Sequence, residues 1–474
     1  MKIIFTSDTH NNLFGGLEKI KASIKKDDET IIIDGGDSFS GSPLDYFKKD
    51  KNLSYYPQAQ VFKEMGLDIA VPGNHDFDDG IEGLKSFIKQ TGAKLLCANL
   101  TSKDSELKIN NHLIYTFNGL KIGFTGIITD YLENIQKKEN LEGIEVLPAV
   151  ETARKELEIL KQNANITVLI YHGGYEIDPR NMGVLSTTTE HQGYRILKEL
   201  DYDLVLTAHQ HIVVPFTKVG SSYTLQCGFN GNRYAELEID KDTITGELKT
   251  PKDCNCTDNK LKDEYESWLD SQIGTLSSPL GPYEPIDVMT KGCGIVDLVN
   301  YIQKELTGAD ISLTSAFNTT VSLSRNITYR ELLKCFPFPN YLVLKWVDEK
   351  IIRMALEKAA SFLEIENGKV VISKKYTEPL LQLFNFDIYM GIEYSFDLSK
   401  PVGQRVAGLK VPKEKLLLVM SDYRGGGNGG YPFFKETETV KITDKSIQDL
   451  LIGFFKENKE PTWPKSGFKG VKTI

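Results

Sequence analysis

Short apolar runs alternate with amphipathic stretches over the first 250 residues of the chain. The runs are rich in β-branched residues and have the length of buried strands, whereas the stretches repeat apolar residues every three or four positions, as helices do. Strands that alternate with helices predict an α/β domain whose sheet is buried on both faces. We expect strands at Lys2–Thr6, Thr30–Asp34, Leu67–Val71, Lys94–Ala98, Lys121–Thr125, Ile166–Tyr171 and Asp203–Thr207, helices at Phe14–Lys26, Gly80–Gln90, Val150–Gln162 and Glu190–Leu200, and a hairpin-like stretch at Ser221–Ile239.

The pattern changes after residue 250. A polar break at Pro251–Thr257 precedes Asn259–Ile273, which carries its apolar residues on one helix face and predicts a linker helix. A second α/β pattern follows, with helices expected at Gly294–Glu305 and Glu349–Glu364 and strands at Asp310–Ala316, Tyr341–Trp346, Phe384–Asp387 and Lys415–Met420. We therefore predict one domain over residues 1–252, a linker helix over 253–274 and a second domain over 275–474.

Composition and charge limit the possible partners. The 474 residues are 40% hydrophobic and 26% charged, as in soluble globular proteins, and the net charge is −9 without a long basic block. This charge argues against nucleic-acid polymers and membranes as partners, so a phosphate ligand would need local cations such as metal ions. We expect a cytoplasmic protein, because no stretch resembles a signal peptide or a membrane span; a processed precursor stays open. The six cysteines are scattered along the chain, so we expect free thiols. The oligomeric state also stays open.

Side chains that bind metals follow five of the predicted strands. Ligands collect outside the carboxyl ends of the strands in an open α/β sheet, so these side chains are expected to meet. In extended backbone, residues two apart project to the same side and could reach one centre. The candidates are Asp8 and His10 after the first strand, Asp37 after the second, Asn74 after the third, His172 after Ile166–Tyr171, and His209 with His211 after Asp203–Thr207.

Two carboxylates, one amide and four imidazoles without a thiolate suit two divalent first-row metal ions, and Mn, Zn, Fe and Co all fit. Asp37, in a Gly-rich turn, is the candidate bridging carboxylate. Two such ions hold a hydroxide and clamp phosphoryl oxygens for in-line displacement. His75 and Asp78 then form a candidate dyad that protonates the leaving alkoxide, whereas Asp76 and Asp79 are expected to be helix caps or solvated charges.

These motifs resemble the signature of the calcineurin-like metallophosphoesterases: Asp8-Thr-His10, Gly36-Asp37, Gly73-Asn74-His75-Asp76, His172 and Ala208-His209-Gln-His211. The run Asn74–Asp78, followed by a second domain, is similar to the 5′-nucleotidases among them. The resemblance implies a four-layer β-sandwich flanked by helices, followed by a linker helix and an α/β nucleotide-binding domain that swings about it. It also implies one metal on the residues Asp8, His10, Asp37 and His211, a second on Asp37, Asn74, His172 and His209, and a catalytic dyad of His75 and Asp78. Ala208 stands where the family usually has Gly.

The second domain resembles the family's nucleoside-binding half at Phe336-Pro-Phe338-Pro-Asn340 and Tyr423-Arg424-Gly425-Gly426-Gly427. Two aromatic rings can sandwich a base, and glycines let the backbone approach the sugar closely. Phe336, Phe338, Asn340, Tyr423, Gly425 and Gly426 are the substrate-binding residues that the resemblance implies. The alternative for the two phenylalanines is a place in the core at strand spacing.

Two features separate branches of the family. The Asn-x-Gly-Gly-x-Arg of 5′-nucleotidases is absent from Asn318–Ser322, and Asn428 stands near an acidic position of that branch. Phe384–Ile388, Gly391–Tyr394 and Gly403–Arg405 resemble instead the 2′,3′-cyclic-nucleotide 2′-phosphodiesterase/3′-nucleotidases, so that activity is favoured. The alternatives are a 5′-nucleotidase or UDP-sugar hydrolase and, from another class, a catalytically silent nucleotide-binding protein. For Asp387 and Arg405 we expect ion pairs that support the fold.

Overall fold

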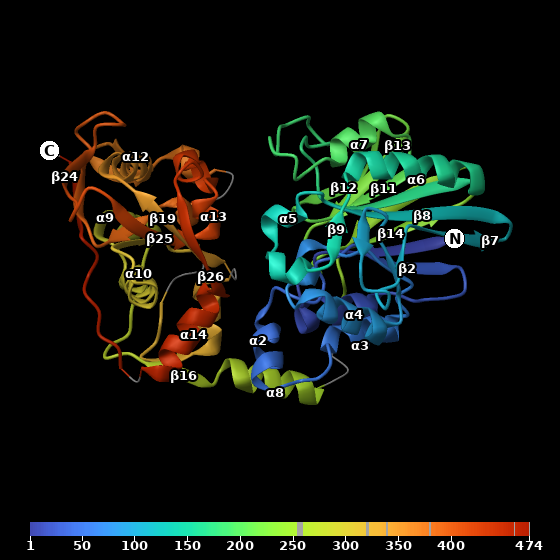
Figure 1. Ribbon diagram of the computed structural model, residues 1–474, viewed down its shortest axis with the longest axis horizontal. Helices are drawn as coiled ribbons and strands as arrows, with labels where there is room; N and C mark the ends of the chain where they lie inside the picture. Colours follow the sequence, from blue (N-terminus) through green and yellow to red (C-terminus); the bar gives the residue numbers. More distant parts are fainter. Residues whose placement is uncertain (254–258, 319–321, 338–339, 379–380, 459, 474) are drawn as a thin grey trace. The chain divides into compact units, whose positions relative to one another are not determined.

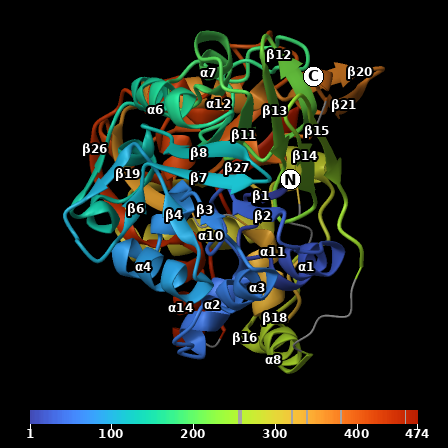
Figure 2. The same ribbon diagram turned by 90° about the vertical axis from the view of Figure 1, so that its right-hand side faces the viewer.

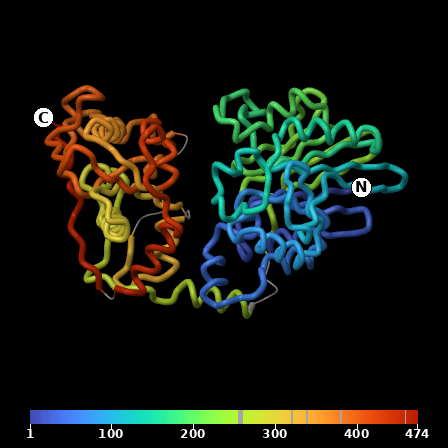
Figure 3. The backbone as a smooth tube through the Cα atoms, viewed as in Figure 1, coloured from blue at the N-terminus to red at the C-terminus, as the bar shows by residue number. Residues whose placement is uncertain are grey.

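The computed structural model describes residues 1–253, 259–318, 322–337, 340–378, 381–458 and 460–473. The chain forms two compact units, Met1–Tyr265 and Glu266–Ile474, and helix α8 (Asn259–Leu269) contains the boundary between them. Figure 3 traces the backbone through both units. Among the described residues, none of the helices has the length and apolar character that crossing a membrane requires.

Two sheets form the centre of the first unit. The larger has the strand order β15-β14-β1-β2-β3-β4-β6, and the smaller has the order β12-β13-β11-β10-β8-β7. Strands β1 to β4 are parallel neighbours in one sheet, and β8, β10 and β11 are parallel neighbours in the other. The strands of the larger sheet are β1 (Lys2–Thr6), β2 (Thr30–Asp34), β3 (Ile69–Ala70), β4 (Lys94–Leu96), β6 (Ile109–Asn110), β14 (Tyr234–Ile239) and β15 (Ile244–Lys249). Those of the smaller are β7 (His112–Phe117), β8 (Leu120–Ile128), β10 (Ile166–His172), β11 (Leu204–Thr207), β12 (Val213–Val219) and β13 (Ser222–Cys227).

The two sheets pack face to face. Alternate residues of β1, such as Ile3 and Phe5, share one buried cluster with Val168 and Ile170 of β10. The opposite face of β10 packs through Leu169 against helices α6 (Ala149–Asn163) and α7 (Gly193–Glu199). Helices α3 (Pro57–Met65) and α4 (Gly80–Thr91) lie on the other side of the unit (Figures 1 and 2). The predicted four-layer sandwich with flanking helices is confirmed.

The structure corrects three expectations for this unit. The strands belong to two sheets, as the family resemblance implies, and not to the single sheet that their periodicity predicts, because each sheet buries one face against the other and one face under helices. Ser221–Ile239 is not a hairpin: β13 and β14 lie in different sheets and pair instead with β12 and β15. Phe14–Lys26 is a π-helical turn at Leu13–Leu17 followed by the short helix α1 (Glu18–Ser23).

The second unit is built on a five-stranded mixed sheet with the order β22-β17-β25-β19-β26. Helix α10 (Gly294–Thr307) buries Ile295, Leu298 and Ile302, and it packs on β17, β22 and β25. The strands are β17 (Ile311–Thr314), β19 (Tyr341–Val347), β22 (Ile388–Met390), β25 (Leu416–Ser421) and β26 (Thr439–Ser446), and the other long helices are α12 (Glu349–Ala360) and α14 (Ile447–Glu457). The α/β character predicted for this half is confirmed.

Smaller sheets complete the molecule and explain two boundary errors; a third error lies before β22. Ile273 lies on strand β16 (Gln272–Thr275), which pairs with β18 (Asn326–Thr328), so the linker helix ends at Leu269. Helix α12 ends at Ala360 because β20 (Leu363–Glu366) pairs with β21 (Lys369–Ile372). The expected strand Phe384–Asp387 is a 3-10 turn at Leu383–Asn385 that leads into β22. The remaining strands are β23 (Glu393–Asp397) with β24 (Val406–Lys410) and β27 (Phe468–Lys472), and β5 (Leu100–Ser102) with β9 (Ile144–Val146).

Candidate functional site

Six of the seven predicted metal ligands lie just after β1, β2, β3 and β11, and the seventh, His172, is the last residue of β10. The first three strands are parallel neighbours in one sheet, and the last two are parallel neighbours in the other, so their carboxyl ends lie at matching edges. The main-chain N–H of His209 donates to Oδ1 of Asp8 at 2.9 Å, across 201 positions of sequence. The packing of the two sheets therefore brings both halves of the ligand set together.

Five of the seven ligands have a left-handed backbone. The φ angles are 51° at Asp8, 46° at His10, 55° at Asp37, 84° at His209 and 61° at His211. Such angles are uncommon for residues other than glycine and are typical of strained functional loops. They correct the expectation of extended backbone, in which His209 and His211 would project to the same side.

Six of the seven ligands form two groups, and within each group one donor atom of every residue lies within 4.8 Å of those of the others. One contains Asp8, His10 and His211, and the other contains Asp37, His172 and His209. The two histidines that follow β11 thus belong to different groups. The Nε2 atoms of His10 and His211 are 2.7 Å apart, and Nε2 of His172 lies 3.3 Å from Oδ2 of Asp37.

Two buried oxygen atoms at this edge support a metal centre. Oδ2 of Asp8 and Oδ1 of Asn74 have no hydrogen-bond partner within the part of the chain that the structure describes. A buried oxygen without a partner is costly unless a cation or water satisfies it. The donor set is rich in imidazole and carboxylate, which suits divalent first-row metals. The residues therefore fit the metal ions that their pattern predicts.

Outer hydrogen bonds orient three of the imidazoles. Nδ1 of His172 lies 2.7 Å from the Gly35 carbonyl, and Nδ1 of His10 lies 3.2 Å from the Ser40 carbonyl. His209 uses its other nitrogen: Nε2 lies 2.9 Å from Oε1 of Glu190. Partners of this kind set the tautomer and leave the opposite nitrogen for a metal. Glu190 was not predicted as a site residue, since the sequence shows it only as a polar residue at a helix start.

Asp76 has a larger role than the helix cap that the sequence predicts. Its buried carboxylate accepts from the main-chain N–H groups of Gly73, Asp37 and Ser38 at 2.8, 2.9 and 3.0 Å. It therefore joins the Asn74 loop to the Asp37 loop. A Cβ at Gly73 would overlap the Asp37 carboxylate, so this close approach requires glycine.

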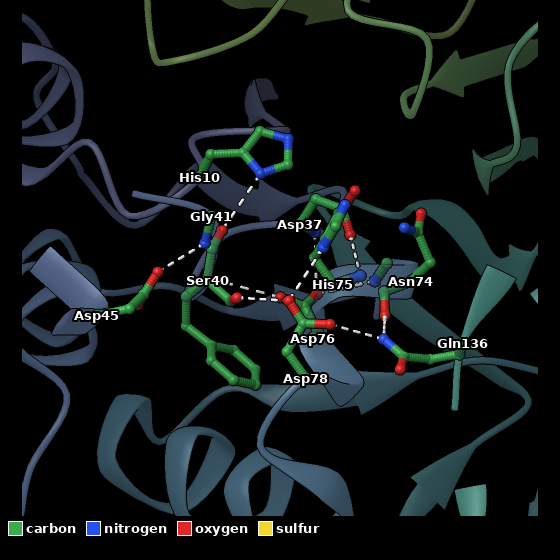
Figure 4. A network of polar contacts seen from close by, with 12 residues as sticks. His10, Asp37, Ser40, Gly41, Asp45, Asn74, His75, Asp76, Asp78 and Gln136 are labelled. Atoms are coloured by element: carbon green, nitrogen blue, oxygen red, sulfur yellow. Dashed lines mark hydrogen bonds and ion pairs between the residues drawn. The ribbon is translucent and has the colours of Figure 1, made fainter. Parts of the chain in front are cut away.

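The predicted dyad is formed, and two further side chains hold it (Figure 4). Nδ1 of His75 lies 3.0 Å from Oδ2 of Asp78, and Oγ of Ser40 donates to the same oxygen at 2.6 Å. Nε2 of Gln136 donates to Oδ1 of Asp78 at 2.7 Å and to the Asn74 carbonyl at 2.9 Å. Gln136 follows the short helix α5 (Leu132–Ile135) and belongs to none of the motifs, so the sequence carried no signal for it.

The crowded charges shift several ionisation equilibria. Burial opposes charge on His75, but the nearby carboxylates of Asp78 and Asp37 raise its pKa to about 10. Burial opposes ionisation of Asp37 as well, yet the surrounding imidazoles hold the pKa of this carboxyl well below its usual value. Burial lowers the pKa of His10 to about 4 and that of His211 to about 3, so both rings are neutral at pH 7, the form that binds metals.

In the second unit, some of the predicted nucleoside-binding residues are exposed and others are buried. Tyr423 is 40% exposed. The N–H of Tyr341 donates to Oδ2 of Asp422 at 3.2 Å, so the chain around Asn340 adjoins that around Tyr423. Phe336 is a correction, because its ring is 3% exposed and packs against Phe317 in the core.

Two more predictions concern Phe338 and the glycines. Phe338 lies outside the described residues. Gly425 is buried, and a Cβ there would overlap the side chain of Val343, so this glycine serves packing on β19. Gly426 is exposed and leaves the loop surface open. Asn340, Tyr423 and Gly426 are thus the accessible members of the predicted set that the structure describes.

Comparison with known families agrees with this geometry. Residues 1–213 match the calcineurin-like phosphoesterase family, and residues 272–436 match the 5′-nucleotidase C-terminal domain. A solved structure of a candidate 5′-nucleotidase from Staphylococcus aureus, crystallised with alpha-ketoglutarate, is 26% identical and covers both chains completely, with a TM-score of 0.84. A 5′-nucleotidase precursor from Thermus thermophilus has a TM-score of 0.61 at 20% identity over 100% of this chain and 99% of the other, which shows a shared fold.

Curated relatives are more distant and often longer. The cell wall protein Lmo0130 of Listeria monocytogenes is 23% identical over 91% of this chain, which spans 61% of that protein. The trifunctional nucleotide phosphoesterase protein YfkN of Bacillus subtilis is 22% identical over 97% of this chain, which spans 38% of it. A 2′,3′-cyclic-nucleotide 2′-phosphodiesterase/3′-nucleotidase of Yersinia enterocolitica is 23% identical over 85% of this chain and 74% of its own length. The chain therefore spans less than two thirds of the first two of these relatives.

Proposed function

The chain belongs to the calcineurin-like phosphoesterases that carry a 5′-nucleotidase C-terminal domain, and from this premise we propose that it hydrolyses nucleotide phosphoesters with two divalent metal ions. One observation carries the proposal: two groups of metal-binding side chains adjoin each other around buried, unsatisfied oxygens of Asp8 and Asn74. The exposed Tyr423 and the adjoining Asn340 in the second unit supply a place for a nucleoside.

In this proposal Asp8, His10, Asp37 and His211 hold one ion, and Asp37, Asn74, His172 and His209 hold the other. Mn, Zn, Fe and Co all suit these donors. When bound, such ions supply the positive charge that polarises a phosphoryl group and acidifies water. Glu190 and the Gly35 and Ser40 carbonyls keep the imidazoles in the orientation that the ions need.

His75 donates the proton to the leaving oxygen. Its Nδ1 is engaged by Asp78, so Nε2 is free to face substrate. Asp78 cannot turn away, because Ser40 and Gln136 bind its two oxygens. A fixed, charged imidazole stabilises negative charge as it develops on the leaving alkoxide and then transfers a proton to it.

We favour 2′,3′-cyclic nucleotides and 3′-nucleotides as substrates. Water would attack phosphorus and break the bond to O2′, leaving a 3′-phosphate; a second water would break the bond to O3′ and release the nucleoside. Support comes from the motifs around Phe384–Ile388 and Gly403–Arg405. It also comes from relatives of that name in Yersinia enterocolitica and Salmonella typhimurium, each 23% identical.

A 5′-nucleotidase or UDP-sugar hydrolase is the second candidate, supported by the similarity to the Staphylococcus aureus structure over the whole chain. Steady-state hydrolysis of 2′,3′-cAMP, 3′-AMP, 5′-AMP and UDP-glucose with added Mn²⁺ separates the two, with Asp37→Asn as the inactive control. Turnover of 5′-AMP alone would reject our assignment. A metal-loaded preparation that hydrolyses none of the four, nor an aryl phosphate, would favour a silent nucleotide-binding protein instead.

A further inference from the structure

Asp387 and Arg424 form a fully buried ion pair in the second unit. Their side chains are 1% and 2% exposed, and Nε of Arg424 lies 2.8 Å from Oδ2 of Asp387. Nη2 of Arg424 donates to Oδ1 of Asp387 at 3.0 Å. The guanidinium therefore contacts both oxygens of the carboxylate, one through a hydrogen bond and the other through an ion-pair contact, and this holds the two groups in one orientation.

The remaining N–H groups of Arg424 bind two separate segments of chain. Nη1 donates to the carbonyl of Asn428 at 2.7 Å, and Nη2 donates to the carbonyl of Phe384 at 3.2 Å. Oδ1 of Asn385 lies 3.5 and 3.4 Å from these two nitrogens. Both terminal nitrogens of the guanidinium thus donate hydrogen bonds, and one side chain joins the turn before β22 to the Gly-rich loop, residues 425–430.

The Gly-rich loop packs directly on this arginine. Gly429 has a φ of 68°, and a Cβ there would overlap Nη1 of Arg424 and Oδ1 of Asn385. The ring of Tyr431 lies 4.0 Å from the guanidinium carbon, and its hydroxyl donates to the Asn385 carbonyl at 2.9 Å. The loop conformation consequently depends on Arg424.

Tyr423 and Arg424 are neighbours in the short helix α13 (Asp422–Gly425) but have opposite environments. The ring of Tyr423 is 40% exposed, whereas the arginine side chain points into the protein. We propose that Arg424, fixed by Asp387, is a positioning residue for the nucleoside: it contacts no ligand but holds Tyr423 and the Gly-rich loop in the conformation that accepts a base and its sugar. This inference rests on the proposed nucleotide substrate.

Arg424→Lys is the main test, because an ammonium has three donors on one atom and cannot bind Asp387, Asn428 and Phe384 at once. Arg405→Lys is the matched control. Arg405 is also buried in the second unit and donates to the carbonyls of Ala360 and Leu363. Arg405→Lys therefore loses hydrogen bonds to main-chain carbonyls, as Arg424→Lys does. Three quantities are measured on the full-length, Mn²⁺-loaded chain: adenosine affinity by calorimetry, KM and kcat for 3′-AMP, and kcat/KM for p-nitrophenyl phosphate.

We expect Arg424→Lys to weaken adenosine binding and raise KM for 3′-AMP about tenfold, the size of one lost base stack, with aryl phosphate hydrolysis unchanged. Arg405→Lys should lower the melting temperature without either effect. Equal changes in the two variants, or equal losses on both substrates, would overturn the positioning role. An inactive wild-type chain that still binds adenosine in an Arg424-dependent way would reject the proposed function and retain this inference.

A double variant covers the case in which Arg424→Lys does not fold. Arg424→Met with Asp387→Leu removes both buried charges and replaces them with apolar groups of similar size, which often preserves stability. We expect a folded protein that has lost the bond to the Asn428 carbonyl and therefore still binds adenosine about tenfold more weakly. Recovery of wild-type affinity in the double variant would show that the pair serves stability alone.

Discussion

Replacing Asp76 should destabilise the first unit strongly, although the sequence predicts a local cap there. The carboxylate is 4% exposed and accepts from three main-chain N–H groups at 2.8 to 3.0 Å. Asp76→Ala leaves these buried donors without an acceptor, at about 1–3 kcal/mol each. Burial and the nearby Asp37 raise the pKa of Asp76 to about 6. The folded protein therefore disfavours this negative charge, and removing it offsets part of the lost stability. We expect a net destabilisation of about 3–5 kcal/mol.

Thermal unfolding of the full chain measures this loss, and a change of this size lowers the melting temperature by about 10 °C. Asp79→Ala is the control. Its side chain is 31% exposed and binds Lys48 Nζ at 3.2 Å and the Tyr56 hydroxyl at 3.0 Å, so we expect less than about 1 kcal/mol. Metal content should fall only in Asp76→Ala, because the Asp37 loop loses its anchor. Equal shifts in the two variants would refute this reasoning.

Four further predictions follow from the site. His75→Ala should keep the bound metal and lower kcat about 10²–10⁴-fold. Halved metal stoichiometry in this variant would instead show that His75 is a metal ligand. Gln136→Leu should lower kcat about tenfold and leave KM unchanged, because Asp78 loses a charge-assisted hydrogen bond; an unchanged kcat would remove Gln136 from the dyad's support. Tyr423→Ala should raise KM for nucleotides about tenfold and spare an aryl phosphate, and equal effects on both substrates would contradict stacking. Chelation should lower the melting temperature as well as activity, since ions that bind only the folded chain stabilise it; calorimetry with and without Mn²⁺ decides this.

The periodicity of the sequence was sufficient to predict strands β1 to β4, β8, β10 and β11 and helices α4, α6 and α7, but not helix α3 or strands β7, β12 and β15. Runs such as Lys2–Thr6 and Thr30–Asp34 are strands with the predicted bounds, because all their residues except Lys2 are buried and no turn residue interrupts them. Boundary errors arose where a helix is followed directly by a short strand, as at Ala360 and Leu363. Apolar residues continue there, and only the pairing of β20 with β21 reveals that the period has changed.

The chemistry of the candidate site was also visible in the sequence, because donor types and their places after strands are local properties. The supporting residues were not. Asp387 was expected in an ion pair and has one, but its partner is Arg424, while Arg405 binds main-chain carbonyls instead. Nothing in the local sequence indicates which of two buried arginines a carboxylate meets.

The sequence by itself thus determined the central strands of the first unit, the set of candidate metal ligands and the pairing of His75 with Asp78, which are only three positions apart. The tertiary structure decided how strands divide between two sheets, the left-handed backbone at Asp8 and Asp37, and the roles of Glu190 and Gln136. The physical reason is separation along the chain. Hydrophobic periodicity specifies which face of a strand is buried, but which strands become neighbours depends on packing of the whole unit. Contacts across that packing are formed only when the chain has folded.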